Sequence, residues 1–223
     1  NARGFLYVHP DGTLEMGASS PERFWNATDA CCNFYGSAVD DSGYLSSLIT
    51  EIGTHYNVDK KRVYVVGHSN GGFMAHRMAC EHADQIAAIV SLAGAMWEDV
   101  SKCTPSEPVS VLEIHGTADA TIAYDGGANG GAMFPSAATT VSDWATLDGC
   151  SSTSDTSAPD LDLESTLMLN GKPEETTVTR YATGCKAGGH AELWSIQGGG
   201  HIPNISPTFV PDLIDFLLAH PKP

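Results

Sequence analysis

Short apolar runs alternate with segments of helical spacing along most of this chain. The runs that predict strands span residues 4–9, 63–66, 86–92, 109–114, 176–181 and 192–197. The segments that predict helices begin near Asp40 or Asp41 and end before Val58, follow Ser69, and span 135–147 and 209–218. This alternation predicts an α/β fold with a mostly parallel sheet and helices on both faces. Ligands of such sheets bind beyond the carboxyl ends of the strands.

Two stretches lack a regular pattern. About thirty polar and aromatic residues follow the Pro10-Asp-Gly12 turn, and residues 150–175 are rich in Ser, Thr and Asp. We expect loops in both places. The length of 223 residues and the absence of a linker-like segment predict one domain over residues 1–223.

Ser69 lies between a predicted strand and a predicted helix, in the sequence Gly67-His-Ser-Asn-Gly71. A serine at such a junction adopts a strained backbone, and we expect Gly67 and Gly71 to remove side chains that would collide there. Its hydroxyl is then exposed at the amino end of the helix. The backbone amide of Asn70 is positioned to donate to an oxyanion that forms during acyl transfer. The pattern is typical of a nucleophile elbow.

A serine nucleophile needs a base and an acid that orients the base, and in strand-to-helix hydrolases the chain order is Ser, Asp or Glu, then His. Asp119 follows the strand predicted at 109–114, and His201 follows the strand predicted at 192–197 through three glycines. An Asx turn is the alternative role for Asp119. Asp125 is the competing acid and His190 the competing base, although His190 precedes its strand.

Three further histidines receive no catalytic role from this pattern. His68 and His76 are too close to the serine in sequence to reach its hydroxyl properly, and His115 belongs to the end of a predicted strand.

The charge and composition of the chain argue against several classes of binding partner. The net charge of −16 comes from 27 acidic and 11 basic residues without a basic cluster, which argues against nucleic acid or an anionic membrane and favours a neutral substrate. No apolar run reaches the roughly 18 residues of a membrane span. The Cys, His and carboxylate residues lack metal-ligand spacing, so we expect no metal and no cofactor.

The six cysteines form no Cys-x-x-Cys pair, which favours disulfides and secretion into an oxidising compartment. We expect Cys80 to pair with Cys103 near the amino ends of the strands, and Cys150 with Cys185 across the polar stretch. The adjacent Cys31 and Cys32 form a vicinal ring or bond elsewhere. Free buried thiols are the alternative.

The motifs around these residues resemble an α/β-hydrolase family that contains secreted polyhydroxybutyrate depolymerase-like, feruloyl and acetylxylan esterases. The motifs are Gly67-His-Ser-Asn-Gly-Gly72, His115-Gly-Thr-Ala-Asp119, Tyr124-Asp-Gly-Gly127, Gly198-Gly-Gly-His201 and residues 25–32 and 39–44. The resemblance implies a carboxylic-ester hydrolase in which Ser69 is the nucleophile, His201 the base and Asp119 the acid that orients it.

The chain departs from this family at its amino end. The family's second oxyanion amide comes from a loop after an earlier strand, and the match here begins only at the family's fourth strand, residues 4–9. In the family, the third strand lies between that strand and the nucleophile strand. We therefore expect that a segment of roughly 50 to 70 residues is lacking, the size of a usual βαβ unit. A smaller, re-paired sheet is the alternative.

The favoured function is a secreted esterase that acts on plant cell-wall esters or short-chain esters, with Trp25, Trp97 and Tyr124 expected to contact the substrate. A polyhydroxybutyrate-type depolymerase is the first alternative, although no separate adsorption module is visible. A non-catalytic binding domain with the same fold is the second.

Overall fold

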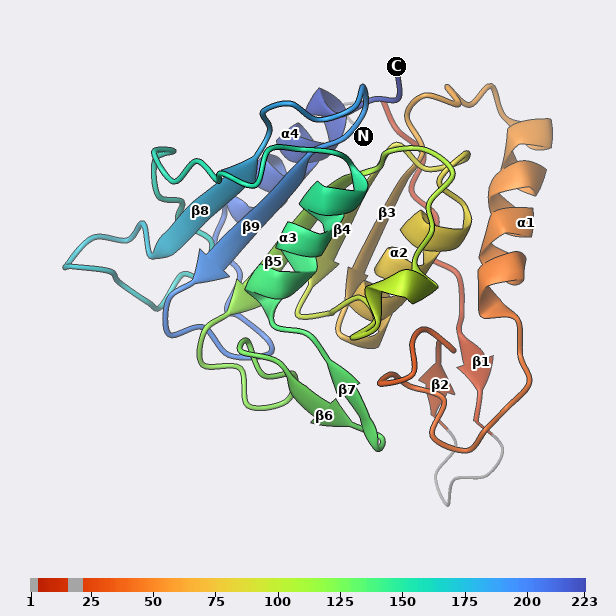
Figure 1. The fold of residues 1–223 in the computed structure, drawn as a ribbon, viewed down its shortest axis with the longest axis horizontal. Helices are drawn as coiled ribbons and strands as arrows, with labels where there is room; N and C mark the ends of the chain where they lie inside the picture. Colours follow the sequence, from red (N-terminus) through yellow and green to blue (C-terminus); the bar gives the residue numbers. More distant parts are fainter. Residues whose placement is uncertain (1–3, 16–21) are drawn as a thin grey trace.

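A computed structural model describes residues 4–15 and 22–223, and a five-stranded sheet forms its centre (Figure 1). The strands follow the order β3-β4-β5-β9-β8 across the sheet. Their bounds are β3 Tyr64–His68, β4 Ala88–Leu92, β5 Ser110–Gly116, β9 Ala191–Ile196 and β8 Thr176–Tyr181. The first four are parallel, and β8 is antiparallel to β9. The predicted mostly parallel sheet is confirmed.

Helices cover both faces of this sheet, as predicted (Figure 1). Helices α2 (Asn70–Glu81) and α3 (Ala137–Leu147) pack on one face, and α4 (Phe209–Ala219) packs on the other. Helix α1 (Asp41–His55) lies beside α2. Its start near Asp40 is confirmed, because the Asp40 carboxylate accepts the Gly43 amide at 2.9 Å and caps the helix.

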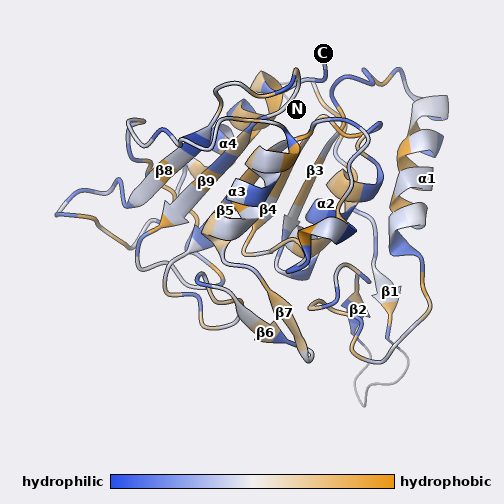
Figure 2. Cartoon of the chain, viewed as in Figure 1, coloured by the Kyte–Doolittle hydropathy of each residue, from blue (hydrophilic) through white to orange (hydrophobic). Residues whose placement is uncertain are grey.

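The side chains of the central strands alternate between two apolar clusters. On β5, Val111 packs with α2 and α3, whereas Leu112 and Ile114 pack with the apolar residues of α4. Figure 2 shows the central strands as the most hydrophobic part of the sheet. A strand that is apolar on both faces has to lie inside a three-layer fold, which explains the continuous apolar runs in the sequence.

The structure adds short elements that the sequence did not predict. They are β1 (Thr13–Leu14), β2 (Arg23–Phe24), the 3₁₀ helix η1 (Val100–Lys102), β6 (Gly127–Asn129) and β7 (Ala132–Phe134). Each strand has two or three residues, too few to show an alternating pattern. β6 and β7 form a hairpin after the carboxyl end of β5.

The strand predicted at residues 4–9 is wrong. No strand forms there, and Phe5, Leu6, Tyr7 and Val8 are between 39% and 78% exposed. The sheet ends at β3, and none of the described residues forms a strand on the outer side of β3. Without a neighbouring strand to share its hydrogen bonds, an apolar run has no ladder to join.

All six cysteines form disulfides. The pairs Cys80–Cys103 and Cys150–Cys185 are confirmed, and of the two possibilities for Cys31 and Cys32 the structure has the vicinal pair.

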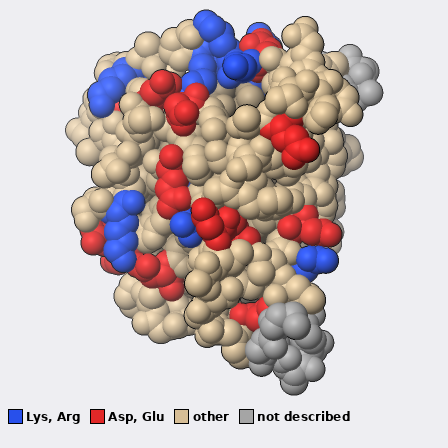
Figure 3. Space-filling view, turned by 90° about the vertical axis from the view of Figure 1, so that its right-hand side faces the viewer, with Lys and Arg blue, Asp and Glu red and all other residues tan. Residues whose placement is uncertain are grey.

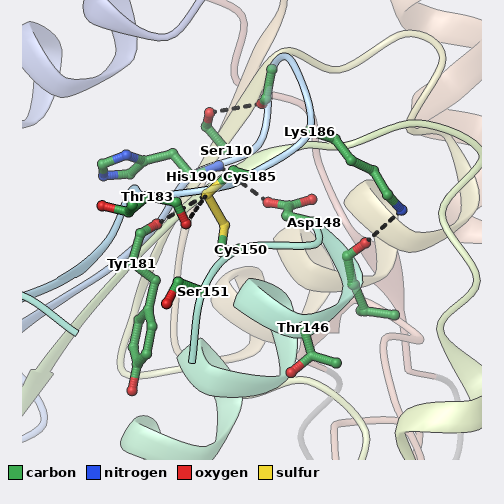
Figure 4. Close-up of a disulfide and its surroundings, with 12 residues drawn as sticks. Ser110, Thr146, Asp148, Cys150, Ser151, Tyr181, Thr183, Cys185, Lys186 and His190 are labelled. Atoms are coloured by element: carbon green, nitrogen blue, oxygen red, sulfur yellow. Dashed lines mark hydrogen bonds between the residues drawn. A yellow bond between two sulfur atoms is a disulfide. The ribbon is translucent and has the colours of Figure 1, made fainter. Parts of the chain in front are cut away.

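Cys150–Cys185 lies beside a buried junction between α3 and the amino ends of two strands (Figure 4). There the Asp148 carboxylate accepts the amides of Val109 and His190, each at 3.2 Å. Burial raises the pKa of Asp148 to about 7 although both amides favour its charged form. The carboxyl therefore connects α3 to β5 and β9 at the amino ends of these strands, whereas Ser69 lies at the carboxyl end of β3.

Replacing both Cys80 and Cys103 with serine is expected to destabilise the fold by about 3 kcal/mol. The bridge joins α2 to the segment after η1 across 23 residues, and its removal frees that loop in the unfolded chain. Urea unfolding followed by circular dichroism measures the change. An unchanged midpoint and slope would contradict this prediction.

Candidate active site

Ser69 occupies a strained turn between β3 and α2. Its backbone has φ 55° and ψ −119°, values rare for a residue with a side chain. A Cβ on Gly67 would come within 1.9 Å of the Gly71 carbonyl oxygen, so glycine is required at position 67. Position 71 has open space instead, and the second tight glycine is Gly72, where a Cβ would meet Ser91 Oγ at 2.7 Å. The expected role of Gly71 is therefore wrong and belongs to Gly72.

The structure brings Ser69, His201 and Asp119 into one hydrogen-bonded row. His201 Nε2 lies 2.9 Å from Ser69 Oγ, and His201 Nδ1 lies 2.7 Å from Asp119 Oδ2. Because a buried carboxylate accepts, Nδ1 carries the proton and Nε2 is free to accept the serine proton. The Asp119 side chain is fully buried and that of His201 is 15% exposed. This geometry suits proton transfer from the serine hydroxyl.

The Asp119 carboxylate is also the acceptor of an Asx turn. Its Oδ1 accepts the amides of Thr121 at 2.7 Å and Ile122 at 2.9 Å, while Oδ2 faces His201. Burial raises the pKa of Asp119, but hydrogen bonds from His115, His201 and the two amides outweigh burial and hold the pKa below its usual value. The turn and the hydrogen bond from His201 therefore use different oxygens of one side chain.

The competing residues are placed elsewhere. Asp125 is exposed in the turn before β6, and His201 bonds to Asp119 instead. His190 lies at the amino end of β9, and its Nε2 is 2.8 Å from Glu192 Oε2. Both alternatives therefore lie outside the hydrogen-bonded row.

Two neighbouring strands deliver the acid and the base. β5 and β9 are parallel neighbours, so the loops that carry Asp119 and His201 leave the same edge of the sheet. The Ala118 amide bonds the Gly199 carbonyl at 2.9 Å, and a Cβ on Gly116 would lie 2.3 Å from that oxygen. Glycines at the strand ends thus allow the two loops to meet.

His68 contacts the candidate base, although the sequence suggested no role for it. Its Nε2 donates to the His201 carbonyl oxygen at 2.8 Å, and the two rings are 4.9 Å apart. Proximity in sequence prevents His68 from acting on Ser69, but it does not prevent a contact with the loop above. His68 therefore holds the backbone of the loop that carries the base.

The Asn70 side chain is hydrogen-bonded to the loop of residues 25–32. Its Oδ1 accepts the Trp25 amide at 2.7 Å, and its Nδ2 donates to the Trp25 carbonyl at 2.9 Å and lies 3.6 Å from Cys31 Sγ. The Asn70 backbone amide lies in the first turn of α2, where amides lack an acceptor within the helix. The side chain is thus engaged, and the amide is the part of Asn70 suited to an oxyanion.

The three aromatic residues expected to contact substrate are differently placed. Trp25 is partly buried and stacks on Tyr44 with ring centres 6.5 Å apart. Trp97 is only 8% exposed, and the Tyr124 hydroxyl is 2.7 Å from Ser195 Oγ. Trp97 belongs to the apolar cluster between the sheet and helices α2 and α3, and Trp25 and Tyr124 pack against that cluster. Their contact with substrate stays a prediction.

The surface charge, the length of the helices and the grouping of possible metal ligands bear on the nucleic acid, membrane and metal partners considered above. On the face in Figure 3, acidic side chains are scattered with a few basic ones among uncharged residues. No helix within residues 4–15 and 22–223 is long and apolar enough to cross a membrane. Across the same residues, no group of three or more His, Cys, Asp or Glu side chains could hold a metal ion.

The sequence is similar to that of known hydrolases. A family model of the alpha/beta hydrolase fold matches residues 50–143. The chain is 29% identical to "Feruloyl esterase B" of Piromyces equi over 83% of this chain and 32% of that protein. It is 28% identical to the "Bifunctional acetylxylan esterase/xylanase" of Neocallimastix patriciarum over 56% of this chain and 16% of that one. The chain thus spans a third or less of the length of these two relatives.

A solved structure shares the fold. It is the "Acetyl xylan esterase from Aspergillus awamori", with a TM-score of 0.53 and 17% identity over 79% of this chain and 66% of that one. At this identity the likeness bears on the fold alone. The α/β-hydrolase fold predicted from the sequence is confirmed.

Proposed function

We propose that this chain, which has the α/β-hydrolase fold, is a serine esterase that cleaves carboxylic esters through an acyl-enzyme on Ser69. The observation that carries the proposal is the row of Ser69 Oγ, His201 and Asp119, with distances of 2.9 and 2.7 Å. Three separate strand ends supply these residues in the order Ser, Asp, His along the chain. The similarity to feruloyl and acetylxylan esterases supports an ester as the substrate.

The mechanism follows from the protonation of this row. His201 Nε2 takes the proton of Ser69 Oγ as the oxygen attacks the ester carbonyl and forms a tetrahedral oxyanion. The imidazolium is held by Asp119 and then returns the proton to the leaving alcohol, which leaves an acyl group on Ser69. Water repeats the two steps with the acyl-enzyme and releases the acid. The proton of each step passes through His201 Nε2.

The Asn70 amide is our candidate for stabilising the oxyanion. It lies directly after the nucleophile at the amino end of α2, where the helix dipole also favours negative charge. One such donor typically lowers the activation free energy by about 2.7 to 4 kcal/mol. The Trp25 amide cannot serve as it stands, because it donates to Asn70 Oδ1.

The substrate class we propose is an ester of a plant cell-wall polysaccharide, with a feruloyl or acetyl group as the acyl part. Its support is the similarity to feruloyl and acetylxylan esterases. Three disulfides fit a protein secreted to such a substrate. A strongly acidic chain is also better suited to a neutral substrate than to a carboxylate-rich one.

A substrate panel tests this function. Methyl ferulate, acetylated xylan, p-nitrophenyl butyrate and a trimer of 3-hydroxybutyrate are compared by kcat/KM with the same preparation. We expect hydrolysis of the panel's esters, with methyl ferulate or acetylated xylan preferred to the hydroxybutyrate trimer. Preference for the trimer would favour a polyester depolymerase. No turnover of any ester would contradict the esterase proposal.

A further inference from the structure

A second row of polar side chains continues from Asp119 into the interior of the protein. Glu113 and His115 lie two residues apart on β5, and His76 reaches them from α2. The exposed fractions of these side chains are 0% for Glu113, 2% for His115 and 0% for His76. Ionisable groups this deeply buried are costly unless they are paired, and the proposed hydrolysis uses none of them.

The hydrogen bonds of His76 fix its protonation. Trp144 Nε1 can only donate, and it lies 3.0 Å from His76 Nδ1, so Nδ1 accepts. The proton of a neutral His76 is then on Nε2, which donates to Glu113 Oε2 at 3.1 Å. Glu113 therefore accepts a hydrogen bond on one oxygen, as a carboxylate does.

The partners of His115 call for a proton on each ring nitrogen. Nε2 is 2.8 Å from the Ile122 carbonyl oxygen, which can only accept, and 3.4 Å from Asp119 Oδ2. Nδ1 lies 3.1 Å from Glu113 Oε1. An imidazolium donates to the Ile122 carbonyl and to Glu113 Oε1 and places its positive charge 3.4 Å from Asp119 Oδ2, whereas a neutral ring would leave one nitrogen facing an acceptor without a proton.

We propose that Glu113 and His115 form a buried carboxylate–imidazolium pair that fixes Asp119 from behind, so that His115 is a positioning residue for the hydrolysis. The inference rests on the proposed function, because Asp119 is there the acid that orients His201. His115 and His201 both contact the same oxygen, Asp119 Oδ2, at 3.4 and 2.7 Å. The orientation of the Asp119 carboxylate is therefore set at Oδ1 by the amides of Thr121 and Ile122, and at Oδ2 by His201 and His115.

The electrostatics of the pair agree with this geometry. Burial lowers the pKa of His115, but hydrogen bonds with Asp119 and Glu113 outweigh burial and raise it to about 10. For Glu113, burial raises the pKa, and the hydrogen bonds from His115 and His76 outweigh it and lower the pKa. The raised pKa keeps His115 charged from acid solution up to about pH 10. Its stabilising effect is present below about 6.5 and is lost as the pH rises through 10.

The charge of His115 acts on the base through Asp119. The groups that face His115 are Glu113 on β5, Asp119 in the following loop and the edge of the Tyr124 ring, 5.7 Å away. His201 contacts the same Asp119 oxygen, Oδ2. A positive His115 opposes a second positive charge on His201. Removing it should let His201 keep its proton to a higher pH.

Kinetics of two variants test the proposal. In His115→Gln and Glu113→Gln, we expect kcat for p-nitrophenyl butyrate to fall about 10-fold to 100-fold, with KM changed less than about twofold, because Asp119 is less well held. In His115→Gln, which removes the positive charge beside Asp119, the acidic limb of the kcat/KM profile should move to higher pH by about 0.5 to 1 unit. A structural defect alone would lower the rate at every pH without moving this limb.

Ser110→Ala is the matched control. Ser110 is buried on the same strand and bonds the Gly188 carbonyl at 3.0 Å, away from Asp119. We expect the pH profile of Ser110→Ala to match that of the wild type. If His115→Gln folds and its acidic limb stays in place, or if Ser110→Ala moves the limb equally, the proposal is overturned.

A measurement on the unmodified protein keeps the test independent of folding and of catalysis. In protein labelled with ¹⁵N-histidine, the ring nitrogens of His115 should both carry protons from pH 6 to pH 9. A His115 ring with a single proton at pH 7 would overturn the proposal even if the protein hydrolyses esters. Two protons on His115 in a protein that hydrolyses no ester would instead refute only the esterase function.

Discussion

Replacing Ser69 with alanine is expected to lower kcat for p-nitrophenyl butyrate by about 10⁴-fold to 10⁶-fold. The alanine lacks the only oxygen that His201 can deprotonate in this row, so no acyl-enzyme can form. Activity that remains would come from the Asn70 amide and from water held in the site. The initial release of p-nitrophenol, followed in a stopped-flow instrument, measures the loss.

The fold itself should tolerate this change. Ser69 precedes α2, but its side chain makes no capping hydrogen bond with that helix. The melting temperature of Ser69→Ala should therefore stay close to that of the wild type. Equal activity of the two proteins would refute Ser69 as the nucleophile.

Replacing Asp119 with asparagine is expected to lower kcat by about 10³-fold to 10⁴-fold. Asparagine can keep one oxygen for the amides of Thr121 and Ile122, but its NH₂ group then faces His201 Nδ1. Two donors cannot face each other, so His201 changes tautomer and its Nε2 no longer accepts from Ser69. The rate constant at pH 8 measures this effect.

Asp125→Asn is the matched control for Asp119→Asn. It removes the same charge from an exposed carboxylate in the next turn, and we expect activity within about twofold of the wild type. A larger loss in Asp125→Asn than in Asp119→Asn would assign the acid to Asp125.

The sequence predicted the arrangement of the candidate site residues well where the fold imposes a rule. In a parallel sheet, residues that directly follow strands meet at one edge, and this placed Ser69, Asp119 and His201 together from their positions in the chain. The same rule rejected His190, which precedes its strand. The position of each residue relative to its predicted strand was therefore sufficient to predict that these side chains meet.

Contacts that depend on packing between layers were not predictable in this way. Nothing in the sequence indicated that His76, on α2, would meet Glu113 on β5, because the register of a helix over a sheet is set by the whole core. The spacing of Glu113 and His115 on one predicted strand was a usable signal, since residues two apart on a strand share a face. Likewise, Gly72 was required by its approach to Ser91 on another strand.

The error at residues 4–9 has a different cause. An apolar run shows that a segment could be buried, but a strand also needs a neighbour with which to share hydrogen bonds. The described residues offer none on the outer side of β3. The sequence pattern therefore indicated that the segment could form a strand, but it could not show that a neighbouring strand was missing from the described part of the chain.

Covalent labelling of the nucleophile tests the central claim most directly. Diethyl p-nitrophenyl phosphate transfers a diethylphosphoryl group to an activated serine and releases p-nitrophenolate as it does so. We predict the incorporation of one group per chain, located by peptide mass spectrometry on Ser69, and a much slower reaction in Asp119→Asn. Labelling of a different residue, or no labelling of the folded protein, would contradict the account.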